Sequence, residues 1–351
     1  MPSKYRCAVL GSTGLVGQRF VQILDSHPWF EAVVLAASEK SAGNTYGDVC
    51  RWQCENPMPK WAREMKVCTA SLSAFREHGV DIVFSALPAS EAVTIEPELA
   101  IRYPVFSKAS AHRMQPDVPL IVPEVNPEQS RLISVQRKRR NWKGFLTADP
   151  NCTTTQLALA LAPFRKYGLR CVNVVSMQAL SGAGINGVGA LETADNVIPY
   201  IKDEEKKVET ETTKIFGRLT ASRIIPANVS VSAACNRVNV SDGHMECVSV
   251  GLKKRVSLAK LKEDIAGFAG EPQCLKTPTA PEKPLILEDA ENRPQPRLDR
   301  DAGRGMSVTL GRLRRDACLD WKFVCLGHNT IRGAAGNGIL HAELFKAYGI
   351  I

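Results

Sequence analysis

The 351-residue sequence lacks any apolar run close to the roughly 20 residues that a membrane-spanning helix needs. It also lacks a secretory signal, so its eleven cysteines indicate free thiols in a reducing compartment rather than a disulfide framework. We therefore expect a cytoplasmic protein with no membrane partner. Internal repeats and low-complexity tracts are absent too, and the length suffices for two domains that each have a core.

Aromatic residues are few, at 6% of the chain. In particular, no aromatic stacking platform and no nucleic-acid-reading motif accompanies the basic tract Arg137-Lys138-Arg139-Arg140. We interpret this tract as an exposed segment and expect no nucleic-acid partner. The net charge of +9 fits an anionic substrate, although a generally solvated surface explains much of it.

The most informative stretch that is present is Pro150-Asn151-Cys152-Thr153-Thr154. It follows an apolar run at 144–148, and the pattern predicts a helix from Thr153 that ends at Gly168. A thiol at the start of a helix meets free N–H groups and the positive end of the helix dipole, which favour the nucleophilic thiolate. The alternative for Cys152 is a small buried hydrophobic side chain, the commonest fate of a free cysteine.

A glycine-rich turn near the start of the chain predicts the class of chemistry. A short strand at 5–10 leads into G-x-x-G-x-x-G, a spaced variant of G-x-G-x-x-G, and then into an apolar-periodic helix. Gly11 permits the tight turn, Gly14 lets the backbone approach a pyrophosphate, and Gly17 lets the helix pack on its strand. We prefer a dinucleotide site to a turn without a ligand. Its predicted contacts are Gly11, Ser12, Thr13, Gly14, Leu15, Val16 and Gly17.

The end of the next strand, at 31–37, indicates which dinucleotide binds. A site for NAD places a carboxylate there for the ribose 2′-hydroxyl. This sequence has Ser38 instead, with Lys40 and Ser41 close by. Because hydroxyls and a cation suit a 2′-phosphate, we predict NADP, with Glu39 directed to solvent.

The spacing of apolar runs divides the chain into two parts. Strands and helices alternate over the first 150 residues, and the runs at 80–87 and 118–122 are typical of buried parallel strands. After Leu169 longer strands are predicted at 171–179, 229–240, 246–252, 306–313 and 321–325. Helices are predicted at 189–201 and 256–268, and a surface loop rich in proline and charge at 277–304.

We therefore predict an α/β protein with two domains. Residues 1–150 form a Rossmann-type dinucleotide-binding domain, which an apolar-periodic C-terminal helix at 329–351 completes. Residues 151–328 form a second, α+β domain on a mixed or antiparallel sheet.

A second chemical motif lies between two predicted strands of that second domain. Asp242-Gly243 is a hairpin-turn signal, so Arg237 and His244 flank one connection. An arginine can hold a carboxylate through two parallel hydrogen bonds, and a histidine can move protons near neutral pH. The alternative for His244 is an exposed histidine in a turn.

Together these motifs resemble the aspartate-β-semialdehyde dehydrogenase family, and within it the archaeal and fungal branch, essentially from end to end. The matching segments are 11–17, 38–43, FSALP at 84–88, AHRM at 111–114, IVPEVN at 121–126, PNCTT at 150–154, QALSGAG at 178–184, 237–244 and NTIRGAAG at 329–336. The resemblance implies NADPH-dependent reduction of L-aspartyl 4-phosphate to L-aspartate 4-semialdehyde plus phosphate, in the biosynthesis of lysine, threonine, methionine and isoleucine. It also implies that 151–328 is a catalytic and dimerisation domain, in a homodimer or homotetramer.

The resemblance further implies a role for each member of the site. Cys152 forms the thioester, His244 is the general acid/base, and Gln178 orients the acyl group. The substrate contacts are Arg237 for the α-carboxylate, Glu204 for the amino group, and Lys207, Arg113 and Asn151 for phosphate. The further cofactor contacts are Ser85, Ser181, Gly182 and Asn329, and no metal site is implied. For Glu204 and Lys207 the alternative is a solvated charged helix.

Two positions depart from the family pattern, since asparagine is usual at both. Asp149 places a carboxylate three residues before Cys152, where it would raise the thiol pKa if it lies close. Lys108 adds a cation that would assist the phosphates or disturb cofactor contacts.

Other functions stay open. A related thioester-forming reductase of malonyl-CoA or N-acetylglutamyl phosphate is one alternative, and a non-catalytic dinucleotide-binding scaffold is another. The joint presence of Cys152, Gln178, Arg237 and His244 speaks against the scaffold, because a binding role needs none of them.

Overall fold

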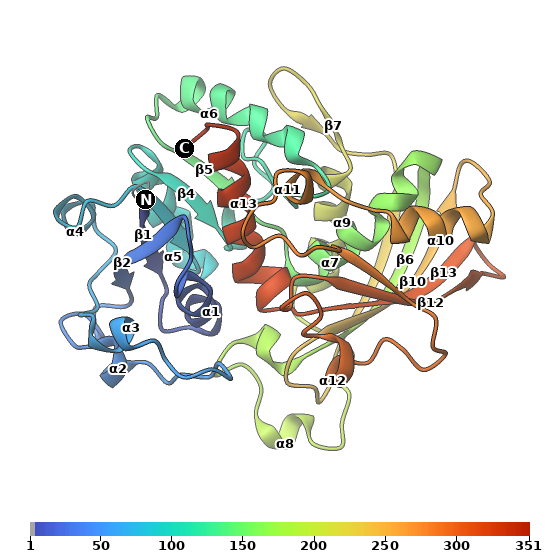
Figure 1. Ribbon diagram of the computed structural model, residues 1–351, viewed down its shortest axis with the longest axis horizontal. Helices are drawn as coiled ribbons and strands as arrows, with labels where there is room; N and C mark the ends of the chain where they lie inside the picture. Colours follow the sequence, from blue (N-terminus) through green and yellow to red (C-terminus); the bar gives the residue numbers. More distant parts are fainter. Residues whose placement is uncertain (1–3) are drawn as a thin grey trace.

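The computed structural model describes residues 4–351, so the first three residues of the expected first domain lie outside the described range. Two sheets lie side by side, and helix α13 (Gly336–Ala347), near the end of the chain, lies between them (Figure 1). The predicted α/β fold, with a parallel sheet followed by a mixed sheet, is confirmed. Across the described range no helix is both long and apolar enough to cross a membrane.

The first sheet is fully parallel, in the order β2-β1-β3-β4-β5. Its strands are β1 (Tyr5–Leu10), β2 (Phe30–Ala36), β3 (Ile82–Ser85), β4 (Pro104–Ser107) and β5 (Phe145–Ala148). Its helices are α1 (Leu15–Leu24), α2 (Tyr46–Val49), α3 (Lys60–Glu64), α4 (Leu72–Glu77), α5 (Ala89–Ala100) and α6 (Leu132–Arg140). The strand order reverses between β1 and β3, and ligands of such sheets bind beyond the carboxyl ends of the strands at this point.

The strand predicted at 118–122 is wrong. Leu120 makes only an isolated bridge to Ala148 beside β5. Pro119 has no N–H to donate, and the N–H groups of Leu120 and Val122 bond to the side chains of Gln129 and Asn126. The segment is buried as its apolar character predicts, but its backbone pairs with β5 only at Ala148, through Pro119 and Ile121, and does not extend into a ladder.

The second sheet is mixed, in the order β11-β12-β13-β10-β6-β9. Its strands are β6 (Leu169–Gln178), β9 (Ser230–Arg237), β10 (His244–Leu252), β11 (Leu285–Glu288), β12 (Val308–Arg315) and β13 (Trp321–Gly327), and β7 (Arg218–Leu219) pairs with β8 (Ile224–Ile225) apart from it. The helices here are α7 (Cys152–Leu161), α8 (Ala190–Thr193), α9 (Glu204–Ile215), α10 (Leu258–Ala266), α11 (Glu271–Cys274) and α12 (Pro296–Asp299).

Two predicted elements of this part differ from the structure. The helix predicted at 189–201 shrinks to α8, because its apolar residues Leu191 and Val197, 94% and 57% exposed, have nothing to pack against. The loop predicted at 277–304 contains β11, which pairs in parallel with β12 at the sheet edge, and the short helix α12.

Helix α13 belongs to the core of the first sheet although it follows the last strand of the second. Ile339, Ala342 and Phe345 are fully buried in one apolar cluster with Phe20 and Phe106. An irregular helical turn at Ile331–Ala335 leads from β13 into this helix. The chain therefore crosses back to the cofactor side, and residues 329–336 lie where the two sheets meet.

Candidate active site

Cys152 is the first residue of α7, one residue before the predicted start, and α7 ends at Leu161, where a 3-10 helix continues to Tyr167 before Gly168. Asn151 is the N-cap, and its side-chain Oδ1 accepts hydrogen bonds from the N–H groups of Thr153 (2.9 Å) and Thr154 (3.2 Å). On the other side Gly333 lies so close that a Cβ there would be 2.7 Å from the Cβ of Cys152. The thiol is thus held between α7 and the turn before α13.

His244 faces this thiol from the start of β10. Its Nε2 lies 3.1 Å from the Sγ of Cys152, and its Nδ1 accepts a hydrogen bond of 3.1 Å from the backbone N–H of Ala179. Because a backbone N–H can only donate, the neutral ring carries its proton on Nε2, directed at the sulfur. Burial, and then the nearby Arg237 and His328, lower the pKa of His244 well below its usual value, so the ring is neutral.

The thiolate expected from the start of the helix is not favoured in the protein without ligands. Burial, followed by the charge of Glu204, raises the pKa of Cys152 to about 12 and outweighs Arg113 and Arg237. The backbone N–H of Thr153, which also donates to the Asn151 cap, lowers the pKa of the thiol more than either arginine does, but not enough to offset burial. The predicted location is therefore right, whereas the predicted effect on the thiol is wrong for this state.

Arg237 and Gln178 end two neighbouring parallel strands, β9 and β6, in register with each other. The Arg237 guanidinium donates to the carbonyl of Ala179 (2.5 Å), the residue whose N–H orients His244. Gly182 covers both side chains, since a Cβ there would lie 2.9 Å from Arg237 and 3.0 Å from His244. The hairpin predicted at Asp242-Gly243 is wrong, because β6 lies between β9 and β10 in the sheet and pairs with both. The 237–244 and 178–184 segments nevertheless form one cluster.

Helix α9 places the predicted acidic contact beside the nucleophile. Glu204 is buried, and its carboxylate accepts from the side-chain amide of Asn151 at 2.8 Å. Lys207, one turn on, lies 3.6 Å from the same carboxylate and is partly exposed. The solvated-helix alternative therefore fails for Glu204, while the side chain of Lys207 stays 31% exposed.

Sequence reasoning missed Glu211 on the same helix. Its carboxylate accepts from the backbone N–H of Asn151 (2.6 Å) and from Arg113 (2.9 Å), and so joins the cysteine motif to a predicted phosphate contact. Glu211 follows Glu204 by seven residues, two helical turns, and this spacing was the available signal. Arg113 also donates to the carbonyl of Lys108 at 2.7 Å.

The predicted cofactor residues of the second domain are in contact with one another. Asn329 donates to the hydroxyl of Ser181 (2.8 Å) and accepts from the N–H of Gly243 (2.9 Å). These bonds tie the 178–184 and 237–244 segments to the turn that enters α13. Next to them lies a cavity of about 310 Å³. Its lining includes Leu15 from the start of α1, Ser181 from the segment after β6, and Asp242 from the segment before β10.

The glycine turn has the predicted geometry. Gly11 has a φ of +66°, and a Cβ there would lie 2.6 Å from the carbonyl oxygen of Ala86. A Cβ on Gly17 would lie 2.2 Å from the oxygen of Gly11. Gly14 caps α1 without a side chain, while Ser12 turns inward and bonds to the carbonyl of Ala36 (3.1 Å).

The remaining cofactor candidates differ in exposure. Ser38 and Lys40 are exposed after β2, and Ser41 donates its N–H to the carbonyl of Ser38, which closes a turn. Glu39 is exposed as well, in agreement with the prediction. Ser85 ends β3 with a buried hydroxyl that has no hydrogen-bond partner within the described chain.

The two residues that depart from the family pattern contact each other. The ammonium of Lys108 lies 3.2 Å from the carboxylate of Asp149, and both side chains are buried. Lys108 and His341, which is 2.9 Å away, hold the pKa of the Asp149 carboxyl below its usual value despite the opposing effect of burial. Among the carboxylates, Glu204 makes the largest contribution to the raised pKa of the thiol.

Arg19 is a second residue that sequence reasoning missed. It is 4% exposed on α1 and contacts Glu55 (2.6 Å), Thr330 (3.1 Å) and Asp242 (3.9 Å), so it joins the cofactor helix to the second domain. Its position three residues after Val16 places it on the apolar face of the helix, which was the signal.

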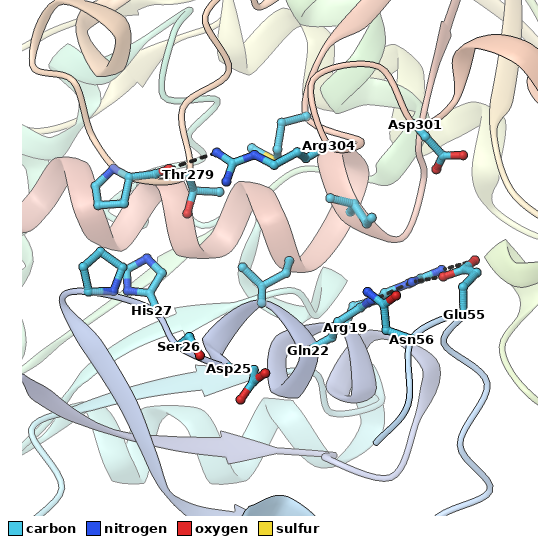
Figure 2. A pocket seen from close by; sticks show the side chains of 15 residues that line it. Arg19, Gln22, Asp25, Ser26, His27, Glu55, Asn56, Thr279, Asp301 and Arg304 are labelled. Atoms are coloured by element: carbon cyan, nitrogen blue, oxygen red, sulfur yellow. Dashed lines mark hydrogen bonds and ion pairs between the residues drawn. The ribbon is translucent and has the colours of Figure 1, made fainter. Parts of the chain in front are cut away.

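Arg19 also bounds a larger cavity, of about 560 Å³, that lies between α1 and the segment carrying Asp301 and Arg304 (Figure 2). None of the predicted site residues lines this cavity. Beside it, Glu55, Asp242 and His328 offer possible metal ligands within 4.8 Å of one another, but the Arg19 guanidinium already lies against the two carboxylates.

Comparison with known proteins agrees with this geometry. Residues 6–133 match the family model "Semialdehyde dehydrogenase, NAD binding domain", and residues 161–332 match "Semialdehyde dehydrogenase, dimerisation domain". An aspartate-semialdehyde dehydrogenase of Methanothermobacter thermautotrophicus is 51% identical over 96% of this chain and 98% of its own. A malonyl CoA reductase (NADP) of Metallosphaera sedula is 39% identical over 99% and 98% of the two chains.

A solved structure of an aspartate semialdehyde dehydrogenase has the same fold. The crystal structure of aspartate semialdehyde dehydrogenase with NADP from Candida albicans superposes with a TM-score of 0.89, at 38% identity, over 99% of this chain and 100% of that one. The resemblance inferred from the sequence motifs is confirmed. By sequence and fold, this chain belongs to the semialdehyde dehydrogenase family.

Proposed function

We propose that this protein reduces L-aspartyl 4-phosphate to L-aspartate 4-semialdehyde with NADPH and releases phosphate, in the biosynthesis of lysine, threonine, methionine and isoleucine. The observation that carries the proposal is the 3.1 Å contact between the sulfur of Cys152 and Nε2 of His244, beside Arg237 and Glu204. A thiol, an N–H donor and charges of both signs together suit an amino acid with an activated acyl group.

The glycine turn fits a dinucleotide. No side chain fits at Gly11 or Gly17, and the first N–H groups of α1 have no side-chain cap among the described residues, so they are free for a pyrophosphate. Ser85, Ser181, Gly182 and Asn329 would hold the nicotinamide half. When bound, the cofactor supplies the hydride. Ser38, Lys40 and Ser41 favour the 2′-phosphate of NADP, because Ser38 stands where a site for NAD has a carboxylate and the neighbouring Glu39 is exposed.

Cys152 acts in its thiolate form, after the thiol has lost its proton to solvent. Its sulfur bonds to the acyl carbon while the carbon–oxygen bond to phosphate breaks, and phosphate leaves with the electron pair. The thioester carbonyl is then reduced, and the resulting oxyanion collapses to the aldehyde as the carbon–sulfur bond breaks and returns its electrons to sulfur. The Nε2–H of His244 donates to sulfur and then to this oxyanion, which supports the donor half of its predicted acid/base role.

The other residues position the substrate. Arg237 holds the α-carboxylate, Glu204 the amino group, and Gln178 orients the acyl group. Lys207 and Arg113 bind the phosphate. Asn151 reaches the phosphate only if its amide leaves Glu204, because its side chain is otherwise engaged with α7 and α9.

The two proposed domains are consecutive in the chain, apart from the C-terminal helix. We place the NADP domain at 1–150, completed by 329–351, and the catalytic and dimerisation domain at 151–328. The enzyme works as a homodimer in the cytoplasm. Two copies would meet at the open face of the second sheet, where Val175 is 40% exposed and lies opposite Cys247, which is also exposed.

One experiment tests the reaction. The protein should reduce NADP with aspartate semialdehyde only when phosphate is added, and reduce aspartyl phosphate in reverse. Malonyl-CoA, the substrate named in one relative, should be reduced far more slowly, because it has no amino group for Glu204. Faster reduction of malonyl-CoA than of aspartyl phosphate would select the alternative.

A further inference from the structure

A buried ion pair between Lys108 and Asp149 plays no part in the mechanism above. Lys108 directly follows β4 and Asp149 directly follows β5. Because Ser107 and Ala148 are in register in these parallel strands, the next residues face each other. The Nζ–Oδ2 distance is 3.2 Å, and the two side chains are 7% and 0% exposed.

The two oxygens of the Asp149 carboxylate have different partners. Oδ1 of Asp149 is held by α13, from Asn337 (3.0 Å) and His341 (2.9 Å). Gly338 lets the helix approach, since a Cβ there would lie 3.0 Å from Oδ2. Within residues 4–351, neither Oδ2 nor the ammonium of Lys108 has another hydrogen-bond partner. Lys108 therefore compensates Asp149 on the Oδ2 side, while α13 uses Oδ1 of the carboxylate as an anchor.

This pair adjoins the reacting thiol. Asp149 precedes Cys152 by three residues, and the Lys108 carbonyl binds Arg113. Burial lowers the pKa of Lys108, and the charges that oppose this are Asp149 and a thiolate on Cys152. An isolated buried carboxylate here would repel a thiolate, and an isolated ammonium would attract it.

We propose that Lys108 is a positioning residue whose ammonium cancels the charge of Asp149, so that α13 keeps its buried anchor without opposing thiolate formation at Cys152. The inference rests on the nucleophilic role of Cys152 in the proposed function. The other charged and titratable groups that face the thiol are Glu204 from α9, His244 from β10, Arg237 from β9 and Arg113. Those that face Asp149 are Lys108 and His341.

The test compares Lys108→Asn, Asp149→Asn and the double variant in the full chain. The readout is the rate constant for alkylation of Cys152 by iodoacetamide between pH 7 and 9, followed on its peptide by mass spectrometry. Lys108→Asn should slow alkylation about tenfold, the effect of one pKa unit, and Asp149→Asn should accelerate it by a similar factor. The double variant should return to within about threefold of wild type.

A structural role alone would lower the melting temperature of both single variants without shifting alkylation in opposite directions. Shifts of the same sign, no shift, or a double variant that resembles Lys108→Asn would overturn the proposal. If Lys108→Asn alone does not fold, two other comparisons test the proposal. The double variant must be alkylated more slowly than Asp149→Asn, and Lys108→Arg must be alkylated at the rate of wild type. Alkylation needs no substrate, so it is independent of the reduction assay. If the expected alkylation pattern is found in a protein that does not reduce aspartyl phosphate, the proposed function is rejected and this inference stands.

Discussion

At the scale of single residues, the chemistry depends on an imidazole whose orientation is set by the backbone. The Ala179 N–H fixes Nδ1 of His244 as an acceptor, so the ring faces Cys152 as a donor. Arg237 holds the carbonyl of the same Ala179. One residue of the 178–184 segment therefore links the substrate clamp to the ring that faces the nucleophile.

Cys152→Ser should keep NADP binding and lose almost all turnover, because a serine hydroxyl at neutral pH is a far weaker nucleophile than a thiolate. The measurements are cofactor titration and the rate of phosphate-dependent NADP reduction. Turnover within a few-fold of wild type would remove Cys152 from the mechanism.

Alkylation of Cys152 in the ligand-free enzyme should depend steeply on pH. Since burial and Glu204 raise the thiol pKa to about 12, the thiol is protonated throughout the neutral range. The rate of reaction with iodoacetamide should rise about tenfold for each pH unit from 7 to 9, as the thiolate fraction does. A plateau below pH 8 would mean that the thiol is already ionised, and Cys152→Ser gives the background from the other cysteines.

Arg237→Leu should mainly damage substrate recognition. Loss of a charged contact from a site built around it should cost about 2–5 kcal/mol in kcat/KM. Because Arg237 also holds the carbonyl of Ala179, NADP titration and the melting temperature serve as controls for local disorder. An unchanged kcat/KM would reject the carboxylate clamp.

At the scale of elements, the turn after β2 decides cofactor choice. Ser38→Asp places a carboxylate where Ser38, Lys40 and Ser41 would meet the 2′-phosphate, so the preference for NADP over NAD should fall sharply or reverse. Titration of wild type and variant with both cofactors measures this. Glu39→Asp, an exposed change in the same turn that keeps the charge, is the matched control and should alter neither affinity. A variant that discriminates as wild type does would contradict the assignment.

Elements with strong local signals could be predicted from the sequence, and elements that depend on distant partners could not. The glycine turn and the start of α7 follow from local residues, and both lie where they were expected. The segment at 118–122 has strand-like composition, but the side chains of Asn126 and Gln129 satisfy its backbone. Equally, two charges that looked like separate anomalies, Lys108 and Asp149, compensate each other, which only the strand register reveals.

At the scale of the whole molecule, the C-terminal segment holds the two sheets together. Arg332 pairs with Glu124 through two hydrogen bonds of 2.7 and 2.6 Å, fully buried and 208 positions apart in the chain. Gly333 then covers Cys152, and α13 enters the core of the first sheet. Cys152, at the start of α7, is thus enclosed by the segment that leads into α13.

The same scale gives the last prediction, which concerns the homodimer. On the open face of the second sheet, β6 and β10 present apolar side chains in register, with Val175 opposite Cys247 and Met177 opposite Met245. Val175→Glu puts a charge on this face, and burying it unpaired in an interface is unfavourable, so the variant should sediment as a monomer. Val93→Glu, at a 54% exposed position on α5, is the matched control and should remain a dimer. A dimeric Val175→Glu would move the interface elsewhere.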